Sequence, residues 1–253
     1  MAMRYLGPSF DIHTGGVDLV FPHHEDEIAQ SEAATGEPFA RTWLHNAHLQ
    51  MGGSKMAKST GNIAKPADLY AAGIRPRALR YALLATHYRS PLEFSDRSLD
   101  AASAAVERLN TAVRALDDYA VEGPADDPTL PQVLTDARAA FTAGLEDDLN
   151  ISAALAAAFD LVRVLNGRIA SRSLSTADAR RGAALMRELD TVLGVLEHDA
   201  DTELPSELTE MLEARVQARA DRDWARSDEL RDALAEAGVV VEDTPDGQRW
   251  RKV

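Results

Sequence analysis

The sequence predicts a mainly α-helical protein that begins with a partial α/β region. Two short strand-like stretches, with one helix-like stretch between them, occur before residue 64. Beyond that point apolar residues recur at helical spacing, and the last residues have the alternation and the turn of a β-hairpin. With 253 residues, 45% of them hydrophobic, the chain is long enough for two or three domains.

The α/β region has the order of elements that is typical of a parallel sheet. The expected elements are a strand at 10–13, a helix over 18–34 capped by Asp18, a strand at 43–49, and a loop rich in Gly and Ser at 52–62. Two strands do not complete such a sheet. The region is therefore either a small α/β piece or part of a larger sheet whose other strands lie elsewhere.

The remaining elements are mostly amphipathic helices. Apolar residues at helical spacing predict helices at 77–84, 96–120, 131–144, 151–170, 176–197, 206–219 and 225–237. A linker rich in Gly, Pro and Asp is expected at 123–128, and the alanines and leucines of 151–170 favour packing in a helical bundle. Residues 239–243 and 248–252 are expected to pair as a hairpin.

The composition excludes several classes of protein. No apolar run approaches the ~20 residues of a membrane span, and the N-terminus lacks a signal-peptide pattern. We therefore expect a cytoplasmic protein without a membrane partner. The chain has no cysteine, which excludes disulfides and thiolate metal ligands within it.

The formal net charge of −14 argues against a nucleic-acid partner only if the acidic groups are evenly spread. They are not, because residues 1–98 hold 10 basic and 10 acidic side chains, and the whole excess lies in residues 99–253. Basic and aromatic side chains concentrate near the end of the chain, at Arg219, Arg222, Trp224, Arg226, Arg231, Arg249, Trp250, Arg251 and Lys252. This set is the candidate RNA-binding face, unless its arginines pair with carboxylates and its tryptophans belong to the core.

The densest cluster of metal-ligand side chains lies at residues 23–27. On a helix, His23 and Glu27 lie one turn apart on the same face, where an imidazole nitrogen and a carboxylate oxygen can bind one Zn²⁺ together. Two ligands do not make a site, because zinc takes three or four from the protein. The alternative is a solvated first turn, whose carboxylates are favoured by the helix dipole.

Two further pairs of residues lie where a ligand could bind. Lys55 and Lys58 stand three residues apart among small residues and could bring ammonium groups onto a polyphosphate, or they belong to an ordinary exposed loop. His13 and Asp18 flank a strand-to-helix turn, and ligands of parallel sheets bind at the carboxyl ends of strands. A structural turn explains this second pair nearly as well.

Taken together, these stretches resemble the cysteinyl-tRNA synthetases, a family of class I aminoacyl-tRNA synthetases. The matching stretches are, in order, 10–16, 18–32 with its His-His-Glu-Asp-Glu, 43–45, the Lys-Met-Ala-Lys-Ser loop at 55–59, 87–92, and the tail from 222 to 250. The resemblance spans nearly the whole chain. The combination of His-His-Glu-x-Glu with the lysine loop is what makes it specific.

The resemblance implies a zinc ion that recognises the substrate cysteine through its thiolate, a soft ligand that serine lacks. His23 and Glu27 match two of the four zinc ligands of the family, and the other two are cysteines upstream of the matching region. His13 and Asp18 resemble residues that line the pocket for the amino acid and ATP.

The loop at 55–59 resembles the Lys-Met-Ser-Lys-Ser motif of the family, with Ala57 in place of serine. The resemblance implies that Lys55, and above all Lys58, stabilise the pyrophosphate that leaves when ATP adenylates the amino acid. We expect the alanine to be tolerated, because both lysines are kept.

The resemblance also implies a family chain nearly twice as long, of which this sequence matches the C-terminal half. The expected domains are the second half of a Rossmann-like catalytic core at 1–64, a connecting helical segment at 65–98, a helical-bundle tRNA-binding domain at 99–200, and a small α/β anticodon-binding domain at 205–253. The expected partners are tRNA-Cys, cysteine, ATP and the missing N-terminal half. That half would supply the first ATP motif and both zinc cysteines.

The expected function is therefore that of a cysteine–tRNA ligase, present as a C-terminal fragment. One alternative is the cysteine ligase of the mycothiol pathway, a relative that transfers activated cysteine to an amino sugar. Another is a non-catalytic tRNA-binding fragment, in which Lys55 and Lys58 would be relics.

Overall fold

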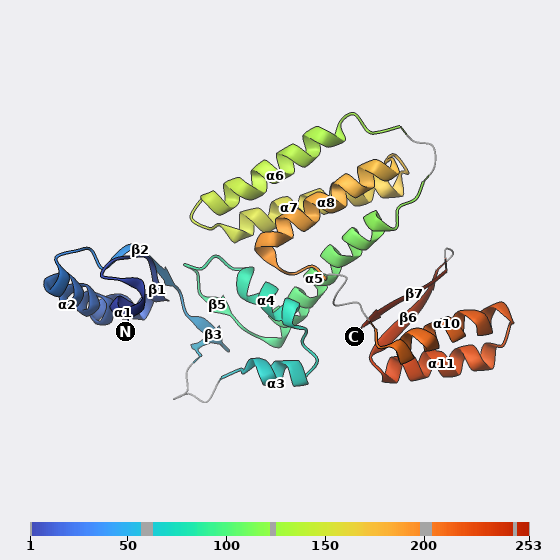
Figure 1. The fold of residues 1–253 in the computed structure, drawn as a ribbon, viewed down its shortest axis with the longest axis horizontal. Helices are drawn as coiled ribbons and strands as arrows, with labels where there is room; N and C mark the ends of the chain where they lie inside the picture. The colour runs from blue at the N-terminus through green and yellow to red at the C-terminus, as the bar shows by residue number, and fades with distance from the viewer. Residues whose placement is uncertain (1, 57–62, 122–124, 198–203, 245–246, 253) are drawn as a thin grey trace. The chain divides into compact units, whose positions relative to one another are not determined.

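The computed structural model describes residues 2–56, 63–121, 125–197, 204–244 and 247–252. The chain divides into two compact units, Met1–Leu196 and Glu197–Val253 (Figure 1). Each unit has a hydrophobic core of its own. Most of the described residues are helical, and the strands are short, as the sequence predicts.

The first unit begins with a two-stranded parallel sheet. Its elements are α1 (Ala2–Leu6), β1 (Phe10–Gly16), α2 (Glu25–Thr35) and β2 (Ala40–Asn46). Strands β1 and β2 run parallel with His13 opposite Trp43, and α2 makes the connection between them (Figure 1). The predicted order of strand, helix and parallel strand is confirmed.

Helix α2 begins later than predicted. Residues Val17–Leu19 form a 3-10 turn, η1, and Val20–His24 form a π-type turn, η2. Phe21 is extended there (φ −135°, ψ 133°), because the proline that follows disfavours a helical conformation at the residue before it. The predicted helix start at residue 18 is therefore wrong, and Asp18 does not cap a helix.

The strand predicted at 43–49 is in fact divided between two sheets. After β2 ends, the Ala47 N–H donates to the Tyr88 carbonyl at 2.7 Å, and the chain enters β3 (Leu49–Met51). β3 pairs antiparallel with β4 (Ser54–Lys55) and parallel with β5 (Leu92–Glu93). The second sheet thus brings Lys55, at the start of the lysine loop, into the same sheet as Leu92–Glu93.

Helices make up the rest of the first unit. They are α3 (Pro66–Ala71), α4 (Pro76–Leu84), α5 (Asp96–Asp117), α6 (Leu130–Glu146), α7 (Ile151–Ala170) and α8 (Thr176–Leu193). Reciprocal capping boxes fix the starts of α5 at Ser95 and of α8 at Ser175. Helices α5 to α8 pack as a bundle, and α6, α7 and α8 lie side by side in Figure 1.

The bundle core is made of large apolar side chains that come from all four helices. Leu109, Phe141, Leu165 and Leu189 are all almost completely buried. Close contact between α6 and α7 depends on Gly144, because a Cβ at this position would lie 2.8 Å from the backbone nitrogen of Ala154. The helical bundle that the alanines and leucines of this region predict is confirmed.

The second unit contains two helices followed by a hairpin. Its described elements are α10 (Ser206–Ala220), α11 (Trp224–Glu236), β6 (Val239–Thr244) and β7 (Gly247–Lys252). The strands pair antiparallel, with Val241 opposite Trp250. Leu212, Leu234 and Val239 form the core of this unit. All four elements match the sequence prediction to within two residues.

In the described part of the chain, none of the helices combines the length and the apolar character that crossing a membrane requires.

Candidate functional site

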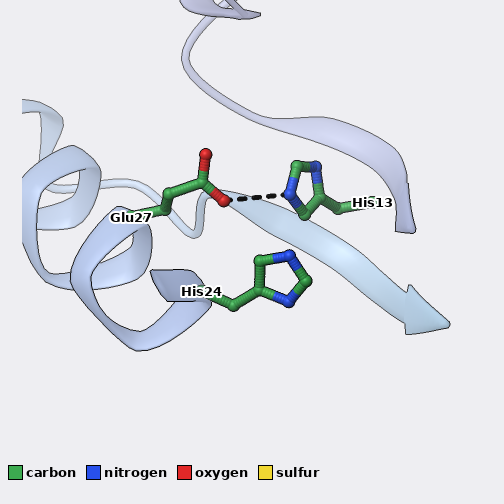
Figure 2. Close-up of side chains that lie close together, drawn as sticks. All are labelled: His13, His24 and Glu27. Atoms are coloured by element: carbon green, nitrogen blue, oxygen red, sulfur yellow. Dashed lines mark hydrogen bonds and ion pairs between the residues drawn. The ribbon is translucent and has the colours of Figure 1, made fainter. Parts of the chain in front are cut away.

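Three ligand-type side chains meet between β1 and the start of α2. They are His13, from β1, His24, from the end of η2, and Glu27, from the first turn of α2. One possible ligand atom from each residue lies within 4.8 Å of the other two. Figure 2 shows the Glu27 carboxylate turned toward the His13 ring, with the His24 ring beside them.

The Glu27 carboxylate is shared between two imidazoles. Its Oε2 lies 3.0 Å from Nε2 of His13, within hydrogen-bond distance, and its Oε1 lies 3.8 Å from Nε2 of His23. The His23 side chain is 59% exposed, whereas those of His13 and Glu27 are 23% and 31% exposed. The sequence-predicted pair of His23 and Glu27 is thus brought together, with the more exposed histidine on the outer side.

His24 lies deepest in the cluster. Its side chain is buried, and its Nδ1 lies 2.8 Å from Nε2 of His45, at the end of β2. Burial lowers the pKa of His24, and the neighbouring His13 and His45 lower it further. The neutral imidazole is therefore favoured, which is also the form that binds metals.

Local sequence explains why the histidines fit so closely. A Cβ on Gly15 would lie 2.6 Å from Cε1 of His24, so only glycine at this strand position leaves room for the buried ring. Trp43 closes the other side, with its ring 4.6 Å from that of His13 and 4.9 Å from that of His24. Because β1 and β2 are in register at His13 and Trp43, the parallel pairing itself builds this wall.

Asp18 and Lys55 form a second cluster. Although they are 37 residues apart in the sequence, Nζ of Lys55 lies 2.7 Å from Oδ2 of Asp18, and Nδ1 of His48 lies 3.8 Å from Oδ1. The hydrogen bond from Lys55 lowers the pKa of the Asp18 carboxyl. Asp18 therefore contacts the start of the lysine loop, whereas Lys58 lies outside the described residues.

Sequence reasoning missed His24, His45 and Trp43 as parts of this site. The signal for His24 is its position beside His23 before a short helix, combined with a glycine opposite it in β1. Nothing in the local pattern marks His45, because its contact with His24 depends on how β2 lies against η2.

The candidate RNA-binding residues of the second unit differ in exposure. Trp224 is 56% exposed with the Arg219 guanidinium 5.6 Å from its ring centre, whereas Trp250 packs against the core. Arg219, Arg226 and Arg231 all form ion pairs with carboxylates. The side chains of Arg249, Arg251 and Lys252 lie outside the described residues. The structure thus leaves Trp224 as the exposed aromatic residue of the predicted face, among those described.

Family models match most of the chain. A model of the tRNA synthetases class I (C) catalytic domain matches residues 1–104, a DALR domain model matches 140–197, and a model of the cysteinyl-tRNA ligase anticodon binding domain matches 201–251.

Curated relatives agree with these matches. A cysteine–tRNA ligase of Symbiobacterium thermophilum is 45% identical over 100% of this chain and 54% of its own length. One of Micrococcus luteus is 46% identical over 99% of this chain and 52% of its own length. The chain thus spans about half the length of the curated relatives it matches.

Similarity to solved structures supports the fold. A LeuRS of Agrobacterium radiobacter K84, solved in a ternary complex with tRNA and LeuAMS, aligns with a TM-score of 0.52 and 18% identity. The alignment covers 77% of this chain and 29% of that one. The family models and the curated relatives together show that the chain is similar, over nearly its whole length, to cysteine–tRNA ligases.

Proposed function

We propose that this chain acts as part of a cysteine–tRNA ligase, which activates cysteine with ATP and transfers it to tRNA-Cys. The observation that carries the proposal is the cluster of His13, His24 and Glu27 within the residues that match the class I catalytic domain. Because the chain spans about half the length of its relatives, we propose that it works together with the other half of the catalytic core. The cytoplasm, which holds tRNA and ATP, is the proposed compartment.

The donor atoms around Glu27 fit a zinc ion. Carboxylate oxygen and imidazole nitrogen are both common zinc ligands, and each Glu27 oxygen lies within 4 Å of an imidazole nitrogen. We assign His23 and Glu27 as the ligands from this chain, and two thiolates would come from the other half. When bound, the zinc would supply a Lewis acid that prefers the thiolate of cysteine to the hydroxyl of serine.

The neighbouring histidines would hold these ligands in place. His13 fixes the orientation of the Glu27 carboxylate by its hydrogen bond, as residues behind a metal ligand commonly do. His24, kept neutral by burial, supports the ring of His13 at a centroid distance of 5.0 Å without adding a positive charge beside the site.

The lysine loop would serve the nucleotide. In this proposal Lys55 leaves Asp18 for the phosphates of ATP, and Lys58 compensates the negative charge that develops on the departing pyrophosphate. The ionised Asp18, whose pKa the hydrogen bond from Lys55 lowers further, would hold Lys55 in its waiting position when no nucleotide is bound.

The bundle and the second unit would bind the tRNA. The match to an anticodon-binding model at 201–251 favours this reading over the mycothiol-pathway ligase, which transfers cysteine to a sugar. The exposed Trp224, with Arg219 over its ring, is suited to stacking on an unpaired base.

Cysteine-dependent ATP–pyrophosphate exchange tests the enzymatic proposal. We expect exchange when this chain is mixed with the N-terminal half of a relative and zinc, and none from either part alone. Exchange by this chain alone would contradict the need for a second half. No exchange by the zinc-supplied pair would contradict the ligase assignment and favour a non-catalytic tRNA-binding role.

The zinc assignment has a separate test, which does not depend on activity. Glu27→Ala should lower the zinc content of the purified pair, whereas Glu25→Ala, a matched change two residues earlier on the exposed side of the same turn, should not. Unchanged zinc content in Glu27→Ala would remove Glu27 from the ligand set.

A further inference from the structure

A carboxylate at the tip of the helical bundle contacts the connecting segment. Asp148 lies in the turn between α6 and α7, and its Oδ1 accepts a hydrogen bond from the Tyr88 hydroxyl at 2.6 Å. The same carboxylate accepts from Arg89, at 2.6 Å from Nε and 3.2 Å from Nη2. Asp148 thus receives three donors from two consecutive residues of the connecting segment.

The backbone of Tyr88 is hydrogen-bonded to the segment that follows β2. Its backbone carbonyl accepts the N–H of Ala47 at 2.7 Å, immediately after β2 ends. Two residues before Ala47, His45 makes the contact with the buried His24. Tyr88 therefore links the carboxyl end of β2, beside the candidate site, to the tip of the bundle.

The turn that presents Asp148 has an unfavourable backbone. Asp148 and Leu149 have φ values of 52° and 55°, a left-handed region that non-glycine residues rarely adopt. Such a conformation persists where its surroundings hold it. Below the turn, the close approach of α6 and α7 at Gly144 and the cap that Asn150 provides for α7 fix the hairpin. Above it, the three hydrogen bonds that the Asp148 carboxylate accepts hold the tip.

Apolar packing does not fill the joint between these parts. An open cavity of about 470 Å³ lies between the end of β2, the connecting segment and the α6–α7 turn. Leu44, Leu84, Leu145 and Leu149 are among the residues that line it. Because the joint is incompletely packed, its polar contacts take a larger part in fixing the angle between the bundle and the sheet.

Other polar contacts join the bundle to α4 rather than to β2. The Arg80 guanidinium donates to the carbonyls of Val192 and Leu193 at the end of α8, and the Ser152 hydroxyl donates to the Ala85 carbonyl at 3.3 Å. These contacts hold the bundle on the connecting helix. Of the contacts made by Arg80, Ser152 and Tyr88, the hydrogen bond from Tyr88 to Asp148 is the one that leads directly to β2.

We propose that Tyr88 and Asp148 are positioning residues, which set the orientation of the helical bundle relative to the carboxyl end of β2. The functional consequence rests on the proposed function: a tRNA held by the bundle would reach the catalytic site in the correct position only when this joint is formed. Neither residue needs to touch the substrate for this role.

Distance measurements on this chain test the joint without reference to activity. Because the chain has no cysteine, Gln30→Cys on α2 and Ala140→Cys on α6, both exposed, can carry a pair of spin labels. We expect a narrow distance distribution in the labelled parent, and a broadened or shifted one in Tyr88→Phe and in Asp148→Asn. Asparagine tolerates the left-handed region, so the turn itself should be kept.

Two matched variants serve as controls for these changes. Tyr70→Phe removes another exposed hydroxyl, and Asp160→Asn breaks an exposed ion pair with Arg163 elsewhere on the bundle. Both should leave the distribution unchanged. Distributions of Tyr88→Phe and Asp148→Asn that coincide with the parent would overturn the proposal.

Kinetics of the complemented enzyme test the consequence. Tyr88→Phe and Asp148→Asn should lower kcat/KM for tRNA charging by about fivefold, the order expected for partly exposed polar contacts, with ATP–pyrophosphate exchange kept. An equal fall in both reactions would contradict a positioning role, because general loss of structure affects both alike. If the parent pair charges no tRNA, the proposed function fails, and the distance measurement still decides the joint.

Discussion

Arg215 offers the sharpest test of how the second unit is held together. Its side chain is 1% exposed, and its guanidinium donates to both carboxylate oxygens of Asp243 at 3.0 Å and to Oε1 of Gln248 at 2.6 Å. These bonds join α10 to both strands of the hairpin. Arg215→Met keeps most of the buried volume and removes the three hydrogen bonds.

The expected loss of stability is about 3 kcal/mol. Removing one partner of a buried charge pair costs about 3–5 kcal/mol. The lower end applies here for two reasons. Asp243 is 39% exposed and keeps its ion pair with Arg219, and the buried Nε of Arg215 has no hydrogen-bond partner in the described part of the chain, so an unsatisfied donor is lost as well.

Hydrogen exchange followed by mass spectrometry measures this loss in the second unit alone. At 1.36 kcal/mol for each factor of ten, amides of α10 and α11 that exchange by opening of the whole unit should lose protection by about a hundredfold. Arg226→Met, which removes an exposed ion pair with Glu229, should change protection by less than about threefold. A loss below fivefold in Arg215→Met would refute the reasoning.

The first unit and the pH dependence give further predictions. Leu165→Ala should lower the free energy of unfolding of the bundle by about 3 kcal/mol, because the side chain is fully buried; a loss under about 1 kcal/mol in urea denaturation would contradict this. Gly144→Val should lower the free energy of unfolding of the bundle by about 2 kcal/mol, because the larger side chain forces α6 away from α7. Gly167→Ala, with open space around the position, should instead raise it by up to about 1 kcal/mol. Equal effects of the two substitutions on the melting temperature would show that the close approach of α6 and α7 is unimportant. The hydrogen bond from Arg215 holds the pKa of Asp243 below its usual value. The contribution of this carboxylate to the free energy of unfolding is therefore complete above the unfolded pKa of about 3.9, and it is lost as the pH falls through the lower folded pKa. The hydrogen-exchange protection of the second unit should therefore fall in acid. A smaller fall in Arg215→Met than in the parent would confirm that the interaction of Arg215 with Asp243 is the source of this pH dependence.

Local signals explain why the helices were predicted well. Helix α7 begins, as predicted, one residue after Asn150, whose side chain caps it. The predicted end of α8 at residue 197 is wrong, because Gly194 adopts the left-handed conformation that ends helices and stops α8 at Leu193. The hairpin of the second unit likewise follows from two strand-like runs on either side of the sequence Pro-Asp-Gly. Each of these signals lies within a few residues of the structure that it determines.

The start of α2 and the division of the second strand were not predicted, because neither depends on periodicity alone. Pro22 imposes an extended residue inside an apparently helical stretch, so the pattern around Asp18 is misleading. The chain leaves β2 at Ala47 because the Tyr88 carbonyl, 41 residues away, accepts its N–H. Tertiary contacts of this kind leave no mark in the local sequence.

The candidate site shows the same contrast. The pair of His23 and Glu27 follows from spacing, and the resemblance gives it a role that stays a prediction. The contacts of His24 with His45 and of Asp18 with Lys55 depend instead on the parallel pairing of β1 with β2 and on the position of β4 near the turn after β1. Sequence reasoning could name several of the residues, but only the fold shows which of them meet.

Charging of tRNA-Cys by the two halves together tests the central claim most directly. This chain is mixed with the N-terminal half of a cysteine–tRNA ligase, zinc, ATP, radiolabelled cysteine and a tRNA-Cys transcript, and label on the tRNA is measured. We expect label with the pair, none with either part alone, and none with serine in place of cysteine. A folded, zinc-loaded pair that binds tRNA-Cys but transfers no cysteine to it would contradict the proposed ligase function.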